Sequence, residues 1–243
     1  MNKIEELKEI IDQSHSIVFF GGAGVSTESK IPDFRSDNGL YKKSYRYPAE
    51  VMLSHSFYVQ NPREFFEFYW NQMIYPDALP NDAHKILAKW EAEGKLLAIV
   101  TQNIDGLHQK AGSKNVFELH GSVLRNICTG CHHKYDLEKT MALRDENGIP
   151  HCPHCHKVIK PDVVLYEEGL NENTLYGAID AIEKADCLIV GGTSLVVYPA
   201  AGLLQYFHGK KLVLINRDQT PMDSKADLVI HDSIGRVFKE VEK

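Results

Sequence analysis

Two Cys-x-x-Cys pairs constrain this chain more than any other feature of its sequence. Cys128 and Cys131 form the first pair, Cys152 and Cys155 form the second, and twenty residues separate them. Four thiolates at such a spacing surround one ion in structural zinc sites, where tetrahedral zinc keeps no position open for a substrate. The alternative is four unconnected thiols in a reducing cytosol. We therefore expect a structural Zn²⁺ held by these four cysteines.

Length, composition and charge narrow the class of protein. The chain has 243 residues, 43% of them hydrophobic, and a formal net charge of −6. This size accommodates one large domain carrying a smaller lobe, with a core that does not depend on disulfides. The negative charge gives no general attraction to nucleic acid, and no apolar run approaches the roughly 18 residues of a membrane span. We expect a cytoplasmic protein without nucleic-acid or membrane partners.

Apolar runs alternate with segments of helical periodicity along most of the chain. Most of the runs are continuous, as in strands that are covered on both faces. The runs lie at residues 17–20, 96–100, 116–119, 163–165, 187–190, 211–215 and 228–230. The helical segments lie at residues 82–93, 171–184, 199–207 and 233–241. This alternation predicts an α/β fold with a doubly wound, Rossmann-like parallel sheet, whose ligand lies at the carboxyl ends of the strands.

Two insertions interrupt the alternation. Residues 37–78 are rich in Tyr and Phe and contain three prolines, which indicates a helical module or lid, and residues 123–160 contain the four cysteines. We expect these two insertions to form a small domain made of a helical module and a zinc lobe. The large Rossmann-like domain is then discontinuous, with residues 1–36, 79–122 and 161–243.

The segment 21–27, GGAGVST, directly follows the first apolar run. Glycines at such a turn let the backbone approach a phosphate, and the N-terminus of a following helix supplies unpaired N–H groups. The dinucleotide fingerprint is incomplete, because Thr27 stands where its third glycine belongs. A tight turn without any ligand therefore remains open for this motif taken alone.

Two further segments carry polar groups suited to a nucleotide. In IPDFRS, residues 31–36, Arg35 suits a diphosphate and Phe34 is suited to covering an aromatic leaving group, although a surface ion pair is an alternative. In TQNIDGLH, residues 101–108, Asn103 and Asp105 offer a donor and an acceptor to a carboxamide. Capping of a helix explains either of these two residues equally well.

Histidine and hydroxyl side chains follow the later apolar runs. His120 comes at the end of one run, where an imidazole can act as a general base near neutral pH. The segment GGTS, residues 191–194, follows another run and offers a second site for phosphate or ribose hydroxyls, while Asn216 follows a third and is placed to hold a ribose.

Together these motifs resemble the sirtuin family, in its bacterial type. The match covers the GAGVS and IPDFR segments, TQNIDG, His120-Gly121, both cysteine pairs and Gly192-Thr193-Ser194, in order from about residue 15 to residue 232. The resemblance implies an NAD-consuming protein-lysine deacylase that binds its acylated peptide as an added strand, beside residues 163–167 and 196–198. Its products would be free lysine, nicotinamide and an O-acyl-ADP-ribose.

The resemblance also assigns roles to single residues. His120 would be the base that activates a ribose hydroxyl, and Asn103 would be the second catalytic residue, binding the carboxamide together with Asp105. NAD would be bound by Ala23, Thr27, Phe34, Arg35, Gln102, Asn103, Ile104, Asp105, His120, Thr193, Ser194, Asn216, Arg217, Asp232 and Ser233.

Three departures from the family pattern bear on specificity. Lys30 stands in place of a glycine, and Glu167 adds a carboxylate beside the expected peptide groove, which favours basic residues around the target lysine. Gln72 follows Tyr69 where members that prefer succinyl groups carry an arginine, so we expect acetyl or other neutral acyl groups. Mono-ADP-ribosyl transfer and NAD-responsive binding without catalysis are the alternatives to deacylation.

Overall fold

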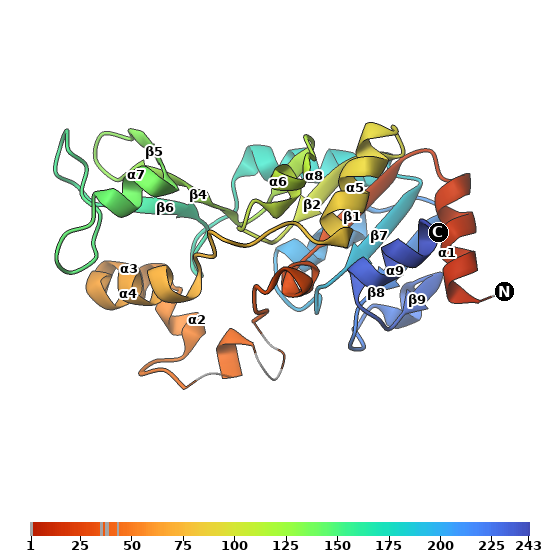
Figure 1. The fold of residues 1–243 in the computed structure, drawn as a ribbon, viewed down its shortest axis with the longest axis horizontal. Coiled ribbons are helices and arrows are strands. Elements are labelled where there is room, and N and C mark those ends of the chain that lie inside the picture. The colour runs from red at the N-terminus through yellow and green to blue at the C-terminus, as the bar shows by residue number, and fades with distance from the viewer. Residues whose placement is uncertain (1, 35, 37–38, 43) are drawn as a thin grey trace.

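A six-stranded parallel sheet forms the centre of the larger part of the molecule (Figure 1). The computed structural model describes residues 2–34, 36, 39–42 and 44–243. The strands are β1 (Ile17–Gly21), β2 (Leu96–Thr101), β3 (Val116–Glu118), β7 (Cys187–Gly191), β8 (Lys211–Ile215) and β9 (Leu228–Ile230). Their order is β3-β2-β1-β7-β8-β9, with every neighbouring pair parallel. The predicted doubly wound α/β fold is confirmed.

The direction of winding reverses at β1, which lies between β2 and β7. In such sheets the chain runs outward in both directions from the first strand, and a crevice opens at the carboxyl ends of the two central strands. The sequence motifs that follow β1, β2 and β7 therefore meet at one edge.

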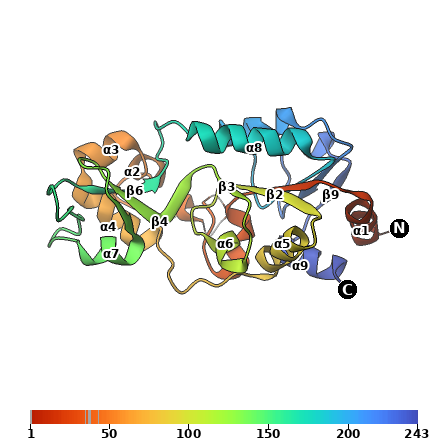
Figure 2. The ribbon, with the colours of Figure 1, turned by 90° about the horizontal axis from the view of Figure 1, so that it is seen from above.

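The strands bury both faces, as their continuous apolar sequences predict. In β1, Ile17 and Phe19 join one core while Val18 and Phe20 join the other, because side chains alternate across a strand. Figure 2 shows the resulting three layers. The helices on one face are α1 (Lys3–Gln13), α5 (Asp82–Ala92) and α9 (Ile234–Val241), and those on the other are α8 (Glu172–Lys184) and the 3₁₀ helix η4 (Ala200–Tyr206).

Local conformation differs from the predictions in three places. The segment 199–207 contains a 3₁₀ helix and no α-helix. The glycine turn after β1 continues into two short 3₁₀ turns, η1 (Ala23–Val25) and η2 (Thr27–Ser29), where we expected the N-terminus of a regular helix. The apolar run 163–165 lies at the end of β6 (Ile159–Val163), which is antiparallel and belongs to a second sheet. Its alternating burial marks a strand covered on one face.

The second sheet is three-stranded and antiparallel, in the order β5-β4-β6. Its other strands are β4 (Gly121–Cys128) and β5 (Lys134–Asp136), and α7 (Leu137–Ala142) follows β5. Next to it lie α2 (Ala49–Met52), α3 (His55–Gln60) and α4 (Pro62–Gln72), preceded by η3 (Leu40–Lys42). The remaining elements are α6 (Leu107–Ala111) and η5 (Asp223–Lys225). No helix in the described ranges is long and apolar enough to cross a membrane.

The short helices 49–72 pack on the second sheet through an aromatic core. Phe65, Phe66 and Tyr69 are fully buried, and the cluster includes Val123 of β4 and Val163 of β6. These cores are separate from those of the large sheet. Such separation is consistent with the small domain expected from the sequence, whose boundaries remain a proposal.

The four predicted zinc ligands converge at the end of the second sheet. Their sulfur atoms all lie within 4.8 Å of one another, with Cys128 and Cys155 at 3.3 Å and Cys131 and Cys152 at 3.6 Å. These separations exceed the roughly 2 Å of a disulfide. They approach the edge of a tetrahedron with zinc–sulfur bonds of about 2.3 Å. The cluster therefore fits a structural zinc ion.

Several donors surround these sulfur atoms. The backbone N–H groups of Gly130 and Cys131 point to Cys128 Sγ at 3.4 and 3.5 Å, and the Tyr135 hydroxyl lies 3.1 Å from Cys152 Sγ. Such donors stabilise thiolates, the form in which cysteine binds zinc. The cluster also forms most of the local core, together with Tyr135 and Ile159.

Replacing Cys152 with serine should release zinc and destabilise the protein. The small core has few other apolar residues, so we expect a loss of about 3 kcal/mol, which for a chain of this size lowers Tm by about 6–12 °C. Zinc content per chain and thermal unfolding measure both effects. As the control, Cys187→Ala changes a thiol of β7 outside the cluster and should keep one zinc per chain. A Cys152→Ser protein with normal zinc content and Tm would contradict the assignment.

Candidate functional site

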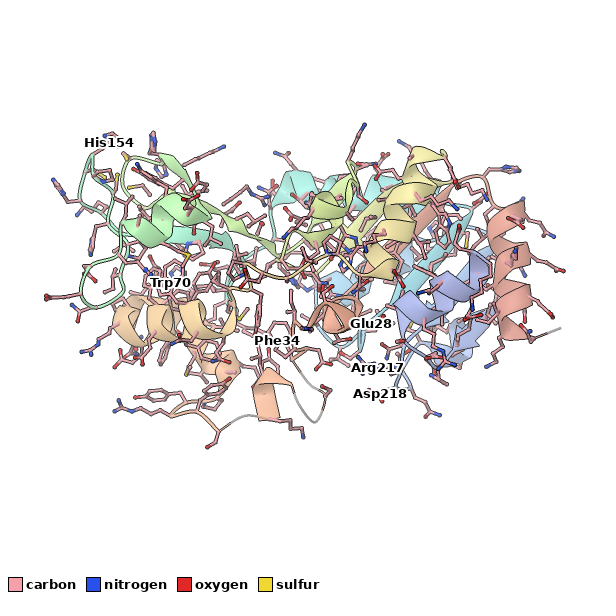
Figure 3. The ribbon with its side chains drawn as sticks, in the orientation of Figure 1. Glu28, Phe34, Trp70, His154, Arg217 and Asp218 are labelled. Atoms are coloured by element: carbon pink, nitrogen blue, oxygen red, sulfur yellow. The ribbon has the colours of Figure 1, made fainter. Side chains whose placement is uncertain are left out.

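A cleft of about 880 Å³ opens at the carboxyl edge of the large sheet. Its walls come from the segments that follow β1, β2, β3, β7 and β8, and on the opposite side from η3, α4, β4 and residues 163–168. In Figure 3, Phe34 lies between the small helices and the large sheet, with Arg217 and Asp218 further along the cleft. The cleft is where the topology of the large sheet predicts a ligand.

Two glycine turns meet at the base of the cleft, backbone against backbone. The N–H of Gly24 donates to the carbonyl of Gly192 at 2.8 Å. A Cβ atom on Gly24 would lie 2.7 Å from Gly192 Cα, and one on Gly192, whose φ is +62°, would lie 2.5 Å from Val25 N. Both positions therefore require glycine, since any side chain would push the turns apart.

Ser26 connects the first turn to the segment after β2. Its hydroxyl is buried, donates to Asp105 Oδ2 at 2.6 Å and accepts from Asn103 Nδ2 at 3.1 Å. The Asn103 side chain is thereby oriented, because its amide nitrogen is fixed by Ser26. The three side chains form one network that lines the cleft.

Asp105 also bonds to the beginning of α6. Its Oδ1 accepts from Leu107 N at 2.9 Å, the first N–H of the helix, although Gly106 and not Asp105 occupies the N-cap position. Burial raises the pKa of Asp105, while its hydrogen bonds with Ser26 and Leu107 oppose that rise. A carboxyl group whose charge is poorly solvated gains from a ligand that donates hydrogen bonds to it.

His120 follows β3 and lines the cleft. Its Nδ1 lies 3.0 Å from the carbonyl oxygen of Gln102. A carbonyl can only accept, so Nδ1 carries the proton and the neutral ring keeps its lone pair on Nε2. Burial lowers the pKa of His120, and the Gln102 carbonyl partly offsets this effect. The imidazole is therefore neutral at pH 7 and able to accept a proton.

Polar contacts also join the ends of other strands. Gln102 Nε2 donates to Thr193 Oγ1 at 3.0 Å and so bridges the segments after β2 and β7. Arg217, after β8, donates to Thr27 Oγ1 at 2.5 Å. These two contacts link side chains that follow four strands, β1, β2, β7 and β8.

The cleft brings together most of the residues expected to bind NAD. Those among its lining residues are Ala23, Phe34, Gln102, Asn103, Ile104, Asp105, His120, Thr193, Ser194, Asn216 and Arg217. Arg35 lies outside the described residues. Thr27 is not among the described lining residues but contacts Arg217, while Asp232 and Ser233 lie at the beginning of α9, where Asp232 forms an ion pair with Arg236 at 3.5 Å.

Sequence reasoning did not select several residues of the cleft. Ser26 stands inside the glycine motif, but its bonds reach Asn103 and Asp105, about 80 positions away in the chain, and no local pattern reveals them. Tyr41 and Tyr166 face each other across the cleft with their hydroxyls 2.5 Å apart. Asp218 and Gln219 also line it. Their position directly after Arg217 was the available signal.

Gln72 and Tyr69, singled out for the acyl group, occupy different environments. Gln72 lines the cleft, and its Oε1 accepts from the Tyr45 hydroxyl at 3.0 Å. The Tyr69 side chain is fully buried in the aromatic core. Among the described residues, this part of the cleft thus presents the neutral amide of Gln72.

The chain matches known proteins over nearly its full length. The model of the Sir2 family matches residues 22–199. A protein of Clostridium perfringens is 64% identical and one of Clostridium acetobutylicum is 61% identical, and each alignment covers 99% of this chain and 98% of the relative. Both relatives are named NAD-dependent protein deacetylase.

Solved structures show the same architecture. A Sir2 protein with a p53 peptide and NAD⁺ is 38% identical with a TM-score of 0.88, and another bound to an acetylated peptide is 37% identical with a TM-score of 0.89. Both comparisons cover 99% of this chain and 97% of the solved chain. The fold, the zinc cluster and the cleft agree with the family match: this chain belongs to the Sir2 family.

Proposed function

We propose that the protein is an NAD-dependent protein-lysine deacylase. It transfers an acetyl or other neutral acyl group from a lysine side chain to ADP-ribose and releases nicotinamide. The observation that carries the proposal is His120, a neutral imidazole in the cleft whose Nδ1 is fixed by Gln102 and whose Nε2 keeps its lone pair. Relatives above 60% identity carry the same activity in their names.

The residues of the cleft divide the reaction between them. Asn103 and Asp105, linked by Ser26, hold the carboxamide of the nicotinamide ring, and Phe34 keeps water away from the reacting carbon of the ribose. The carbonyl oxygen of the acyl-lysine attacks that carbon, and nicotinamide leaves. His120 then takes the proton of a ribose hydroxyl, which attacks the acyl carbon. Water then hydrolyses the resulting intermediate, which gives free lysine and O-acyl-ADP-ribose.

The other half of NAD lies along the segments after β7 and β8 in this proposal. Thr193, Ser194, Asn216 and Arg217 offer hydroxyl, amide and guanidinium donors there. Thr27 acts through its contact with Arg217. The proposal extends to Arg35 for the phosphates, and to Asp232 and Ser233 at the adenosine end.

Mono-ADP-ribosyl transfer to a protein is the second candidate, because it breaks the same bond of NAD. A base positioned to activate a ribose hydroxyl favours deacylation, since transfer to a protein side chain does not use that hydroxyl. In a solved structure that is 39% identical with a TM-score of 0.92, a Sir2 protein holds a deacetylated p53 peptide and 3′-O-acetyl ADP-ribose. We propose the same class of product for this chain.

The substrate and location follow from the rest of the site. The acylated peptide adds as a strand along residues 163–167, and Gln72 makes neutral acyl groups the preferred ones because its side chain is an amide and not a cation. The zinc ion maintains the small domain and takes no part in the reaction. Cysteines that are free of disulfides and grouped as metal ligands are typical of a reducing compartment, which supports a cytoplasmic location.

Acetyl-lysine peptide and NAD labelled in the adenosine half provide the test of the function. We expect one nicotinamide released per lysine freed, with the label in O-acetyl-ADP-ribose, and slower turnover of the succinyl-lysine peptide. Chromatography of the products measures all three. Label retained on protein would instead establish ADP-ribosyl transfer, and faster succinyl turnover would overturn the acyl preference.

Replacing His120 with alanine should reduce kcat roughly 10²-fold or more while NAD binding stays normal, because only the positioned base is removed. Burial lowers the pKa of His120 below its ordinary 6.5, so the wild-type rate should be constant through neutral pH and fall only in more acidic solution. Steady-state rates from pH 5 to 9 measure this. The exposed His15 provides a control, since His15→Ala should leave the profile unchanged. Normal turnover by His120→Ala would assign the base elsewhere.

A further inference from the structure

Glu167 has an unusual backbone conformation for a residue with a side chain. Its φ is +75°, in the left-handed region that glycine adopts without strain, and it lines the cleft at the end of residues 163–167. A non-glycine residue persists there only when surrounding contacts impose the conformation. The question is therefore what holds Glu167 in place.

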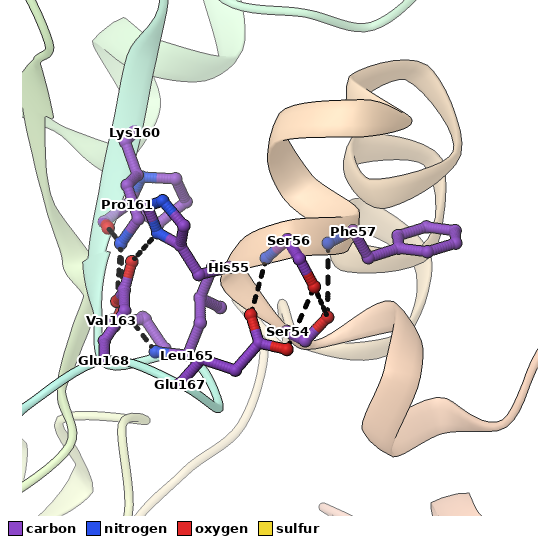
Figure 4. Close-up of polar contacts among 10 residues, drawn as sticks. All are labelled: Ser54, His55, Ser56, Phe57, Lys160, Pro161, Val163, Leu165, Glu167 and Glu168. Atoms are coloured by element: carbon purple, nitrogen blue, oxygen red, sulfur yellow. Dashed lines mark hydrogen bonds and ion pairs between the residues drawn. The ribbon is translucent and has the colours of Figure 1, made fainter.

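The carboxylate of Glu167 is bound at both oxygens by Ser56 of α3 (Figure 4). Ser56 N donates to Oε2 at 2.8 Å, and Ser56 Oγ donates to Oε1 at 2.9 Å. We call this two-bond contact the Ser56–Glu167 clasp. Both carboxylate oxygens of Glu167 therefore already accept hydrogen bonds from Ser56. This weakens the expectation that the carboxylate attracts basic residues of a peptide.

Neighbouring contacts attach the same segment to the small domain. Glu168 bonds to His55 at 2.8 Å and to Lys160 at 3.1 Å, and it accepts from Leu165 N at 2.9 Å. The backbone of Tyr166 accepts from His55 N and donates to Leu53 O, each at 3.0 Å. Residues 165–168 are therefore held from two sides, and the backbone groups of Tyr166 are already in use.

The backbone groups of Glu167 differ from those of Tyr166 in their hydrogen bonding. In the described part of the chain, no hydrogen bond involves its N–H or C=O. Backbone groups at the edge of a cleft are those to which an extended peptide pairs when it adds as a strand. The clasp adds a side-chain contact to the bonds of the two flanking peptide groups, since Tyr166 C=O accepts from His55 N and Glu168 N donates to Leu165 O.

We propose that Glu167 is a positioning residue for the acylated peptide: the Ser56–Glu167 clasp holds its backbone N–H and C=O in the orientation that pairs with the substrate strand. The inference rests on the proposed deacylase function. It assigns to Glu167 a role in peptide affinity that depends on hydrogen bonding to Ser56 and not on negative charge.

Kinetics of four variants test the proposal, with an acetyl-lysine peptide whose flanking residues are neutral. Glu167→Ala removes the clasp and should raise the peptide KM roughly tenfold, the scale of one charge-assisted hydrogen bond, with the NAD KM and kcat changed less than about twofold. Ser56→Ala should act in the same direction. Adding it to Glu167→Ala should cause no further rise, because both changes break one contact.

Glu167→Gln separates hydrogen bonding from charge. An amide can accept from Ser56 N and donate to Ser56 Oγ, so this variant should keep a peptide KM close to the wild type. Glu183→Ala on α8, an exposed carboxylate that is not among the residues lining the cleft, is the matched control and should change nothing. A Glu167→Gln variant as impaired as Glu167→Ala, or impaired only with basic peptides, would overturn the proposal in favour of an electrostatic role.

Two further outcomes distinguish failure of the positioning role from failure of the proposed function. If Glu167→Ala lowers Tm without changing the peptide KM, the clasp is only structural and the proposal fails; should this variant not fold, Ser56→Ala decides by the same criterion. If the wild-type protein frees no lysine from the acetyl peptide, the proposed function fails first. Binding of a labelled peptide, followed by fluorescence anisotropy, would then still report whether the clasp sets affinity.

Discussion

The contact between the glycine turns after β1 and β7 is the constraint on which the rest of the site depends. These turns come from strands that are about 170 residues apart in sequence but neighbours in the sheet. Gly24 and Gly192 approach so closely that neither could carry a side chain. The backbone contact brings Gly22 beside Thr193, and it creates the wall of the cleft at the point where the winding of the sheet reverses.

Hydrogen bonds then orient the polar side chains of the cleft relative to these two turns. Ser26 connects Asn103 with Asp105, Gln102 reaches Thr193 through its side chain, and the carbonyl of Gln102 sets the tautomer of His120. The segment after β2 thus carries the side chains proposed to bind the carboxamide, and its Gln102 carbonyl orients the proposed base. Such mutual orientation places groups before the substrate arrives, so binding does not have to organise them.

Sequence reasoning predicted the fold and the cleft where physical signals are local. Continuous apolar runs identified the six parallel strands, and the cysteine spacing identified the zinc ligands. It was wrong about the run 163–165, because a short apolar run does not reveal which sheet it joins. Ser26 and the Ser56–Glu167 clasp were out of reach for another reason: they depend on contacts between residues about 80 and 111 positions apart.

The central claim is that His120 lies beside the ribose of a dinucleotide whose nicotinamide is held by Asn103 and Asp105. A crystal structure with an acetyl-lysine peptide and an NAD analogue whose glycosidic bond cannot break measures this directly. The account predicts Nε2 of His120 within about 3 Å of a ribose hydroxyl, with the carboxamide bonded to Asn103 and Asp105. A ribose out of reach of that nitrogen, or a nicotinamide ring bound elsewhere, would contradict it.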